Sequence, residues 1–267
     1  MLLPRLPLPA GVGQGRRHPS LIPSPCAGQS ALYTSAGGQN RAKRKIRLPP
    51  KRVTERQQAL RTENENTKDM PPIKIYKFGG ASVRSAEGVE NLARIVAAEP
   101  ARLLVIVSAM GKTTNALEEV LDRFMRNRSD EAIERFAEIE RYHRQIVRSL
   151  FADPSSVEAR TEKLASEVRE LLRSETCRED YDRWYDRIVS YGELLSTVIV
   201  SEYLAAQGTP NRWLDMRGLF VTDSRYREAT INVDRSAQAL RRAVDAAPER
   251  VLVGQGFIGA TPAGRPT

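Results

Sequence analysis

The chain has 267 residues, a formal net charge of +9 and two cysteines. The first 69 residues hold 13 basic and four acidic side chains, whereas 29 basic and 29 acidic side chains follow, so the whole positive excess lies in the leading segment. A nucleic-acid role for the rest of the chain therefore has no electrostatic support. Cys26 and Cys177 cannot form a disulfide framework, and no metal-ligand spacing occurs, so we expect a reduced compartment and no metal site built by side chains.

Residues 1–69 are rich in Pro, Gly, Ser and Arg and contain no acidic residue before Glu55. They show no helical or strand period, so we expect a disordered tail followed by one folded domain over residues 70–267. The tail has the composition of a transit peptide, which would indicate a plastid. The favoured interpretation is upstream sequence read from a wrong start, with Met70 as the initiator and a cytoplasmic protein. The apolar stretch at residues 2–10 contains prolines and is too short to span a membrane, so we expect no membrane association.

Residues 73–83 (IKIYKFGGASV) predict a buried strand that delivers a lysine and then reaches two glycines. Gly79 and Gly80 can adopt positive φ and let backbone N–H groups approach an anion, which favours a phosphate cradle. An ordinary strand end with a Gly-Gly turn is the alternative for this stretch taken alone.

A helix over residues 85–98 and a continuous apolar strand over residues 103–107 (LLVIV) follow. Strand, helix and buried strand form a βαβ unit, which predicts a parallel sheet with ligands bound at the carboxyl ends of its strands.

The next loop, residues 108–115 (SAMGKTTN), invites a P-loop interpretation because it contains Gly-Lys-Thr. A P-loop needs an earlier glycine at position 106, where this chain has Ile106, so the spacing excludes it. We expect instead that Thr113 or Thr114 caps a helix beginning near Asn115.

Residues 116–189 show apolar positions at three- and four-residue spacing and predict a helical excursion. It could form a lid or a dimer surface, but an apolar stripe that packs on the sheet is favoured. Ser190 and Glu193 then match a capping box at the head of an apolar helix over residues 194–206, so Glu193 could simply satisfy backbone N–H groups.

Four motifs now stand in order: residues 77–83 (KFGGASV), 108–115, 190–196 (SYGELLS) and 254–259 (GQGFIG). In order and approximate spacing they resemble the aspartate kinases of the amino acid kinase family, with Ala81 and Met110 as mild departures. The resemblance covers residues 73–267 and implies an α/β fold, a three-layer αβα sandwich with a mainly parallel sheet. In the family a Thr-Thr-Leu-Gly-Arg-Gly-Gly-Ser-Asp loop and a nucleotide-binding half follow, so we expect this chain to represent the amino-acid-binding part of the fold.

The resemblance implies phosphoryl transfer from ATP, with Mg²⁺, to the β-carboxylate of L-aspartate, giving 4-phospho-L-aspartate on the route to lysine, threonine and methionine. It implies Lys77 as the catalytic residue and assigns contacts with the nucleotide phosphates to Lys77, Phe78, Gly79, Gly80 and Ser108. Because the aspartate side chain has a pKa of about 3.9, the nucleophile is ionised at neutral pH and needs no general base.

For the amino acid, the resemblance implies that Thr114 and Glu193 hold the substrate, with Glu193 on its α-ammonium, and that Phe257 walls the pocket. Residues 215–217 and 221–223 match a family loop that lines the site. An intact enzyme of this kind is expected to be a homo-oligomer. A fragment that binds aspartate without turnover, or a kinase acting on glutamate, acetylglutamate or carbamate, are the alternatives.

Overall fold

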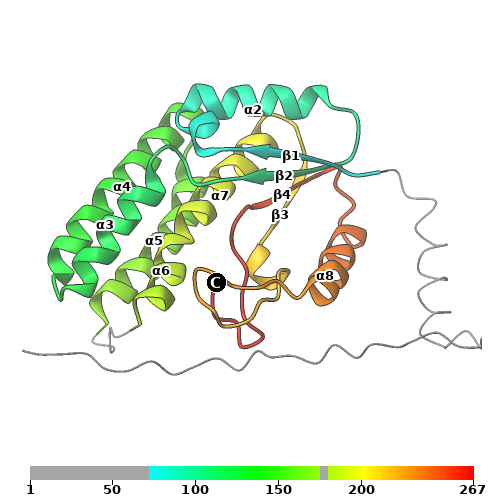
Figure 1. Cartoon of the computed structure of the whole chain (residues 1–267). Coiled ribbons are helices and arrows are strands. Elements are labelled where there is room, and N and C mark those ends of the chain that lie inside the picture. The colour runs from blue at the N-terminus through cyan, green and yellow to red at the C-terminus, as the bar shows by residue number, and fades with distance from the viewer. Residues whose placement is uncertain (1–71, 175–179) are drawn as a thin grey trace, which may run out of the picture. The chain divides into compact units, whose positions relative to one another are not determined.

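The computed structural model describes residues 72–174 and 180–267, and the expected tail over residues 1–69 and Cys177 lie outside these ranges. Four parallel strands form one sheet in the order β1-β2-β4-β3 (Figure 1). Their bounds are Lys74–Phe78 for β1, Leu103–Val107 for β2, Asn211–Leu214 for β3 and Val251–Gln255 for β4. The prediction of a parallel α/β sheet is confirmed.

Seven α-helices and two short 3-10 helices accompany the sheet in these ranges. The helices are α2 (Ala86–Ala98), α3 (Thr113–Met125), α4 (Ser129–Leu150), α5 (Ser155–Arg173), α6 (Tyr181–Val189), α7 (Tyr191–Ala206) and α8 (Val233–Asp245), with η1 at Gly80–Val83 and η2 at Met216–Gly218. The Ser85 hydroxyl accepts a hydrogen bond from the backbone N–H of Gly88 and so caps α2.

Helices cover both faces of the sheet, α2 on one side and α8 on the other (Figure 1). Alternate strand residues point to opposite faces, so Val105 and Val253 join a core with α2 and α7, whereas Leu104 and Leu252 join a core that includes Val244 of α8. This arrangement gives the three layers expected of the fold.

Strand β1 is an edge strand, and the prediction that it is buried is wrong. Ile75 is 66% exposed, because β1 pairs only with β2 and the face that carries Ile75 and Lys77 is not covered by the described helices. Tyr76 and Phe78 point to the opposite face and pack on the core there.

Helices α3 to α6 account for the predicted helical excursion. Their apolar stripes are buried, as Phe124, Phe136 and Leu172 show, but they pack mainly on one another and on α7 rather than directly on the sheet. Residues 181–206 are long and apolar enough to cross a membrane by length and composition alone, yet 83% of the apolar window is buried inside the structure. Core packing therefore accounts for the composition of this segment.

His143 on α4 is 2% exposed, and its Nδ1 lies 2.8 Å from the carbonyl oxygen of Ile139. Burial lowers the pKa of His143 to about 4 despite that hydrogen bond. An unfolded histidine titrates near pH 6.5, so between about pH 6.5 and pH 4 the unfolded chain binds a proton that the folded chain does not.

We predict that this histidine makes the folded state less stable by on the order of 3 kcal/mol as the pH falls from 7 to 4. Urea unfolding of the wild type and of His143→Leu at both pH values measures this change in the free energy of unfolding. The free energy of unfolding of the variant should fall less over this range, because leucine cannot bind a proton. The other titrating groups contribute equally to both proteins and cancel in the difference. Equal pH dependence in the two proteins would contradict the prediction.

Candidate active site

The carboxyl ends of the parallel strands bring distant loops to one edge of the sheet. Phe78, Val107 and Gln255 are in register across β1, β2 and β4, so the loops that follow them lie side by side. A pocket of about 400 Å³ opens at this edge. Among its lining residues are Gly80, Ser108, Thr114, Glu193 and Phe257.

The two glycines after β1 differ in what they require. Gly79 is extended (φ −76°, ψ 163°), and neither Gly79 nor Gly80 has positive φ, so the left-handed backbone that glycine permits is not used at either position. A Cβ on Gly80 would lie 2.4 Å from the carbonyl oxygen of Ala109, whereas a Cβ on Gly79 would meet nothing within 4 Å. Gly80 is thus fixed by close packing between the loops, and Gly79 borders open space.

The loop after β2 starts helix α3 earlier than predicted. The helix begins at Thr113, and Lys112 at its N-cap makes no side-chain cap. The Thr113 hydroxyl is buried and donates to the carbonyl oxygen of Met110 at 2.6 Å, which fixes the loop beneath the pocket. Thr114 lines the pocket, so the prediction that either threonine caps the helix is wrong.

Glu193 is not part of a capping box. Ser190 has helical dihedral angles (φ −57°, ψ −25°) and makes no side-chain cap, so α6 runs almost directly into α7. Instead, Oε2 of Glu193 accepts hydrogen bonds from the backbone N–H groups of Gly256 at 3.0 Å and Phe257 at 2.9 Å. The carboxylate therefore joins α7 to the loop after β4.

The second carboxylate oxygen of Glu193, Oε1, accepts no hydrogen bond from the described residues, although the residue is only 9% exposed. Burial raises the pKa of Glu193, while the two backbone N–H groups and the charge of Lys77 oppose that rise. A buried carboxylate that lines a pocket and has one oxygen without a hydrogen bond is suited to a cationic hydrogen-bond donor.

Lys77 lies beside this pocket rather than in its lining. Its Nζ is 4.6 Å from the ring centroid of Phe257, and its charge acts on Glu193. Phe257 is 74% exposed, so this cation–π contact lies at the mouth of the site. Phe78 is half-buried in the core and does not line the pocket.

Close packing at Gly192 and the hydrogen bonds of Gln255 hold α7 in place. A Cβ on Gly192 would lie 3.0 Å from the Cβ of Ala109, so glycine lets the start of α7 approach the loop after β2. The buried Gln255 donates to the Thr197 hydroxyl at 2.7 Å and accepts from the backbone N–H of Met216 at 2.9 Å. These contacts hold α7 at a fixed position along β4 and so position Glu193.

Sequence reasoning missed Asp186, which lines the same pocket and is 8% exposed. Its Oδ2 accepts from the backbone N–H of Arg227 at 2.8 Å, and burial raises the pKa of Asp186. Asp186, Ser190 and Glu193 follow at i, i+4 and i+7, so the helical spacing of these polar residues was the available signal.

Residues 215–217 and 221–223, the two segments that match a family loop, differ in whether they line a pocket. Asp215 pairs with Arg217 at 2.6 Å and caps η2, and neither lines the pocket. Thr222 lines an adjoining pocket of about 480 Å³, which shares Asp186 and Phe257 with the first. The described residues contain no group of three or more His, Cys, Asp or Glu that could hold a metal ion.

The known proteins that are similar to this chain in sequence include two aspartokinases. Lysine-sensitive aspartokinase 3 of Escherichia coli is 29% identical over 204 residues, which are 74% of this chain and 43% of that protein. The chloroplastic aspartokinase 1 of Arabidopsis thaliana is 37% identical over 147 residues, which are 53% of this chain and 25% of that protein. The chain thus spans less than half the length of these relatives.

The fold also matches a solved structure. Escherichia coli aspartokinase III in complex with aspartate and ADP superposes with a TM-score of 0.61 and 26% sequence identity, over 73% of this chain and 43% of that one. The model of the amino acid kinase family matches residues 72–266, nearly all of the described part. The chain therefore belongs to the amino acid kinase family.

Proposed function

We propose that this chain supplies the amino-acid-binding part of an aspartate kinase, which transfers a phosphoryl group from ATP to the β-carboxylate of L-aspartate. The observation that carries the proposal is the pocket at the strand ends, where buried Glu193 presents a free oxygen beside Thr114 and Phe257. The aspartokinase relatives and the aspartate and ADP in the matching Escherichia coli structure support it.

In this proposal Glu193 binds the α-ammonium of aspartate through Oε1. Its Oε2 is already held by the backbone N–H groups of Gly256 and Phe257, so the carboxylate is oriented before the substrate arrives. The Thr114 hydroxyl can donate to a substrate carboxylate, and the Phe257 ring closes the side of the pocket.

The reaction brings two anions together, so positive charge and backbone donors matter more than a base. Lys77 supplies the charge at the mouth of the pocket, and the open space around Gly79 leaves room for the phosphates. A bound Mg²⁺ would neutralise phosphate charge.

Location and assembly remain predictions. The Arabidopsis relative is named as chloroplastic, which accords with the transit-peptide alternative for residues 1–69. The cytoplasmic alternative and a homo-oligomeric intact enzyme also remain predictions.

The direct test is calorimetric titration of this chain with L-aspartate and with MgADP, followed by an assay of ADP formation. The proposal expects aspartate to bind, with L-glutamate at least tenfold weaker. Aspartate binding without ADP formation would identify a binding part that needs the remaining length of its relatives for turnover. Absence of aspartate binding by the folded chain would overturn the proposal.

For Lys77 we predict that Lys77→Met, in a protein extended to the length of the aspartokinase relatives, lowers kcat on the order of a hundredfold or more. Aspartate binding should stay nearly unchanged, because the lysine charge acts where the phosphoryl group is transferred. Steady-state kinetics and calorimetry on the same variant measure the two quantities. A near-normal kcat would remove Lys77 from catalysis.

Glu193→Gln tests the substrate contact against a purely structural role. A glutamine oxygen can still accept from Gly256 and Phe257, so we expect the free energy of unfolding to change by less than about 1 kcal/mol. Its amide turns a donor toward the substrate ammonium, so aspartate affinity should fall at least tenfold, or about 1.5 to 3 kcal/mol. Unchanged affinity with an unchanged thermal melt would leave Glu193 only as the link between α7 and β4.

The two glycines offer a matched pair of variants. Gly80→Ala places a Cβ against the Ala109 carbonyl, so we expect a loss of about 1 to 3 kcal/mol in stability. Gly79→Ala meets no protein atom and should melt like the wild type, yet it fills the space proposed for phosphate and should weaken MgADP binding. Thermal melts measure the stability of both variants, and calorimetry measures their MgADP binding. Equal effects of the two substitutions on stability would contradict the packing argument.

A further inference from the structure

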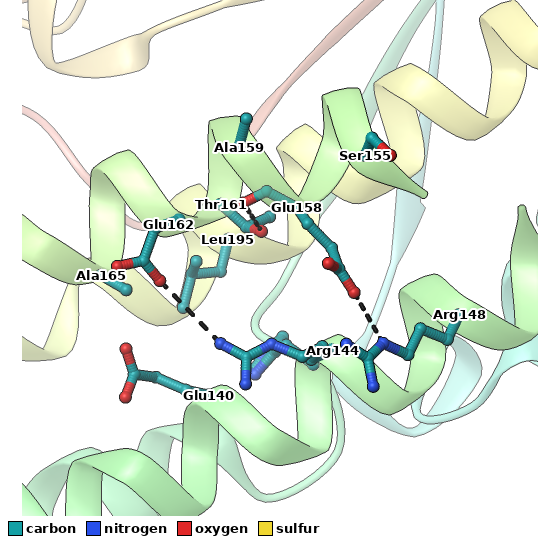
Figure 2. Close-up of a pocket in the computed structure, with 11 residues that line it drawn as sticks. Glu140, Arg144, Arg148, Ser155, Glu158, Ala159, Thr161, Glu162, Ala165 and Leu195 are labelled. Carbon is teal, nitrogen blue, oxygen red and sulfur yellow. Dashed lines mark hydrogen bonds and ion pairs between the residues drawn. The ribbon is translucent and has the colours of Figure 1, made fainter. Parts of the chain in front are cut away.

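The acidic side chains that line the cavity between α4, α5 and the start of α7 are all paired with arginines (Figure 2). Among these pairs, Glu158 lies 2.7 Å from Arg148 and Glu162 lies 3.9 Å from Arg144. Asp186, at the strand ends, is also buried but has no ion pair among the residues that the structure describes. Its carboxylate must therefore be stabilised in another way.

Asp186 binds the tip of the loop that joins η2 to α8. Its Oδ2 accepts a hydrogen bond from the backbone N–H of Arg227 at 2.8 Å, although the two residues are 41 positions apart. Cζ of Arg227 lies 4.6 Å from the ring centroid of Tyr185, and the guanidinium pairs with Asp182 at 3.1 Å. Three residues of α6 thus contact one residue of the loop.

Arg227 has a backbone conformation that a residue with a Cβ disfavours. Its φ is 62°, in the left-handed region, so the surrounding contacts must hold it there. The ion pair with Asp182 joins two exposed side chains and contributes little. The hydrogen bond to buried Asp186 is therefore the contact that holds the tip of the loop.

The loop held in this way forms part of the wall of the site. The pocket of about 480 Å³ has loop residues in its lining, among them Phe220, Thr222, Ala229 and Ile231. The base of the loop is fixed to the segment after β4, because the backbone N–H of Thr222 donates to the carbonyl oxygen of Ala260 at 2.9 Å. The tip is fixed to α6. Asp186 and Phe257 line this pocket and the one that contains Glu193, so the position of the loop bears on both.

We propose that Asp186 is a positioning residue for the amino-acid substrate. By binding the backbone N–H of Arg227, it fixes the loop that bounds the site and so raises the affinity for aspartate. It acts through the loop and does not contact the substrate. This inference rests on the function proposed for the strand-end pocket.

Substitutions at Asp186 separate the acceptor from the charge. Asp186→Asn keeps an oxygen that can accept from the Arg227 N–H, so aspartate affinity should stay within about threefold of the wild type. Asp186→Leu removes the acceptor at similar volume and should weaken aspartate binding about tenfold or more. Calorimetric titration measures both affinities, and thermal melts check that each variant is folded.

A matched pair at Arg227 tests the backbone conformation. Glycine adopts positive φ readily and keeps the N–H, so Arg227→Gly should bind aspartate within about threefold of the wild type. Valine disfavours positive φ, so Arg227→Val should weaken binding about fivefold or more. Asp182→Asn removes only the exposed ion pair and is the control, which should bind like the wild type.

Amide hydrogen exchange reports the loop itself. Exchange in residues 222–230 should be faster in Asp186→Leu and Arg227→Val than in the wild type, because the tip is released from α6. Should Asp186→Leu fail to fold, Arg227→Val carries the same test.

A direct contact between Asp186 and the substrate would give a different pattern. Asp186→Asn would then lose as much affinity as Asp186→Leu, and Arg227→Val would bind normally, which would overturn the inference. Wild-type binding that neither Asp186→Leu nor Arg227→Val weakens would also overturn it, while leaving the proposed function intact. A folded wild type that does not bind aspartate would overturn the proposed function and this inference with it.

Discussion

The carboxylate of Glu193 holds together the parts of the fold that form the site. By accepting from the backbone N–H groups of Gly256 and Phe257, it ties the first turn of α7 to the exit of the central strand β4. The exchange of water for two backbone donors makes burial of a charged group tolerable. The second oxygen accepts no hydrogen bond from the described residues, so the same side chain supports the architecture and is free for the substrate contact that we propose.

Close approach of backbone segments sets the shape of the same region. Gly80 admits the Ala109 carbonyl, and Gly192 admits the start of α7 against that loop. Gly254, within β4, faces the end of the Met216 side chain, where a Cβ would come within 2.1 Å of its Cε. At these positions lack of space, rather than an unusual backbone angle, favours glycine, most strictly at Gly80, where the neighbouring atom is a backbone oxygen. The packing of these backbone segments therefore sets how closely the loops at the strand ends approach one another.

Helix α4 carries a buried polar side chain, His143, whose surroundings contrast with those of Glu193. Glu193 is buried with two backbone donors, whereas buried His143 has one ring nitrogen without a partner in the part of the chain that the structure describes. The first arrangement orients a charge, and the second costs free energy that the packing of α4 against its neighbours must offset. Burial of the His143 imidazole also accounts for the expected pH dependence of stability, because the neutral ring is held away from water.

Much of the fold follows from local patterns. The apolar run at residues 103–107 and the helix capped by Ser85 determine a βαβ unit, and a parallel sheet then places its loops at one edge. Spacing also excludes a P-loop at Gly111, and the four ordered motifs were sufficient to identify the amino acid kinase family.

Tertiary structure decided what each polar group contacts. From sequence, Ser190 and Glu193 are predicted to form a capping box, but α6 continues almost directly into α7 and the carboxylate reaches the loop after β4, more than sixty residues away. Ile75 reads as buried, yet β1 lies at the sheet edge, and Asp186 gains its place only because α6 faces the loop containing Arg227. Sequence periodicity reports which face of an element is apolar. Only the packed chain determines which element covers that face and which donors lie within reach, because those contacts join residues far apart in sequence.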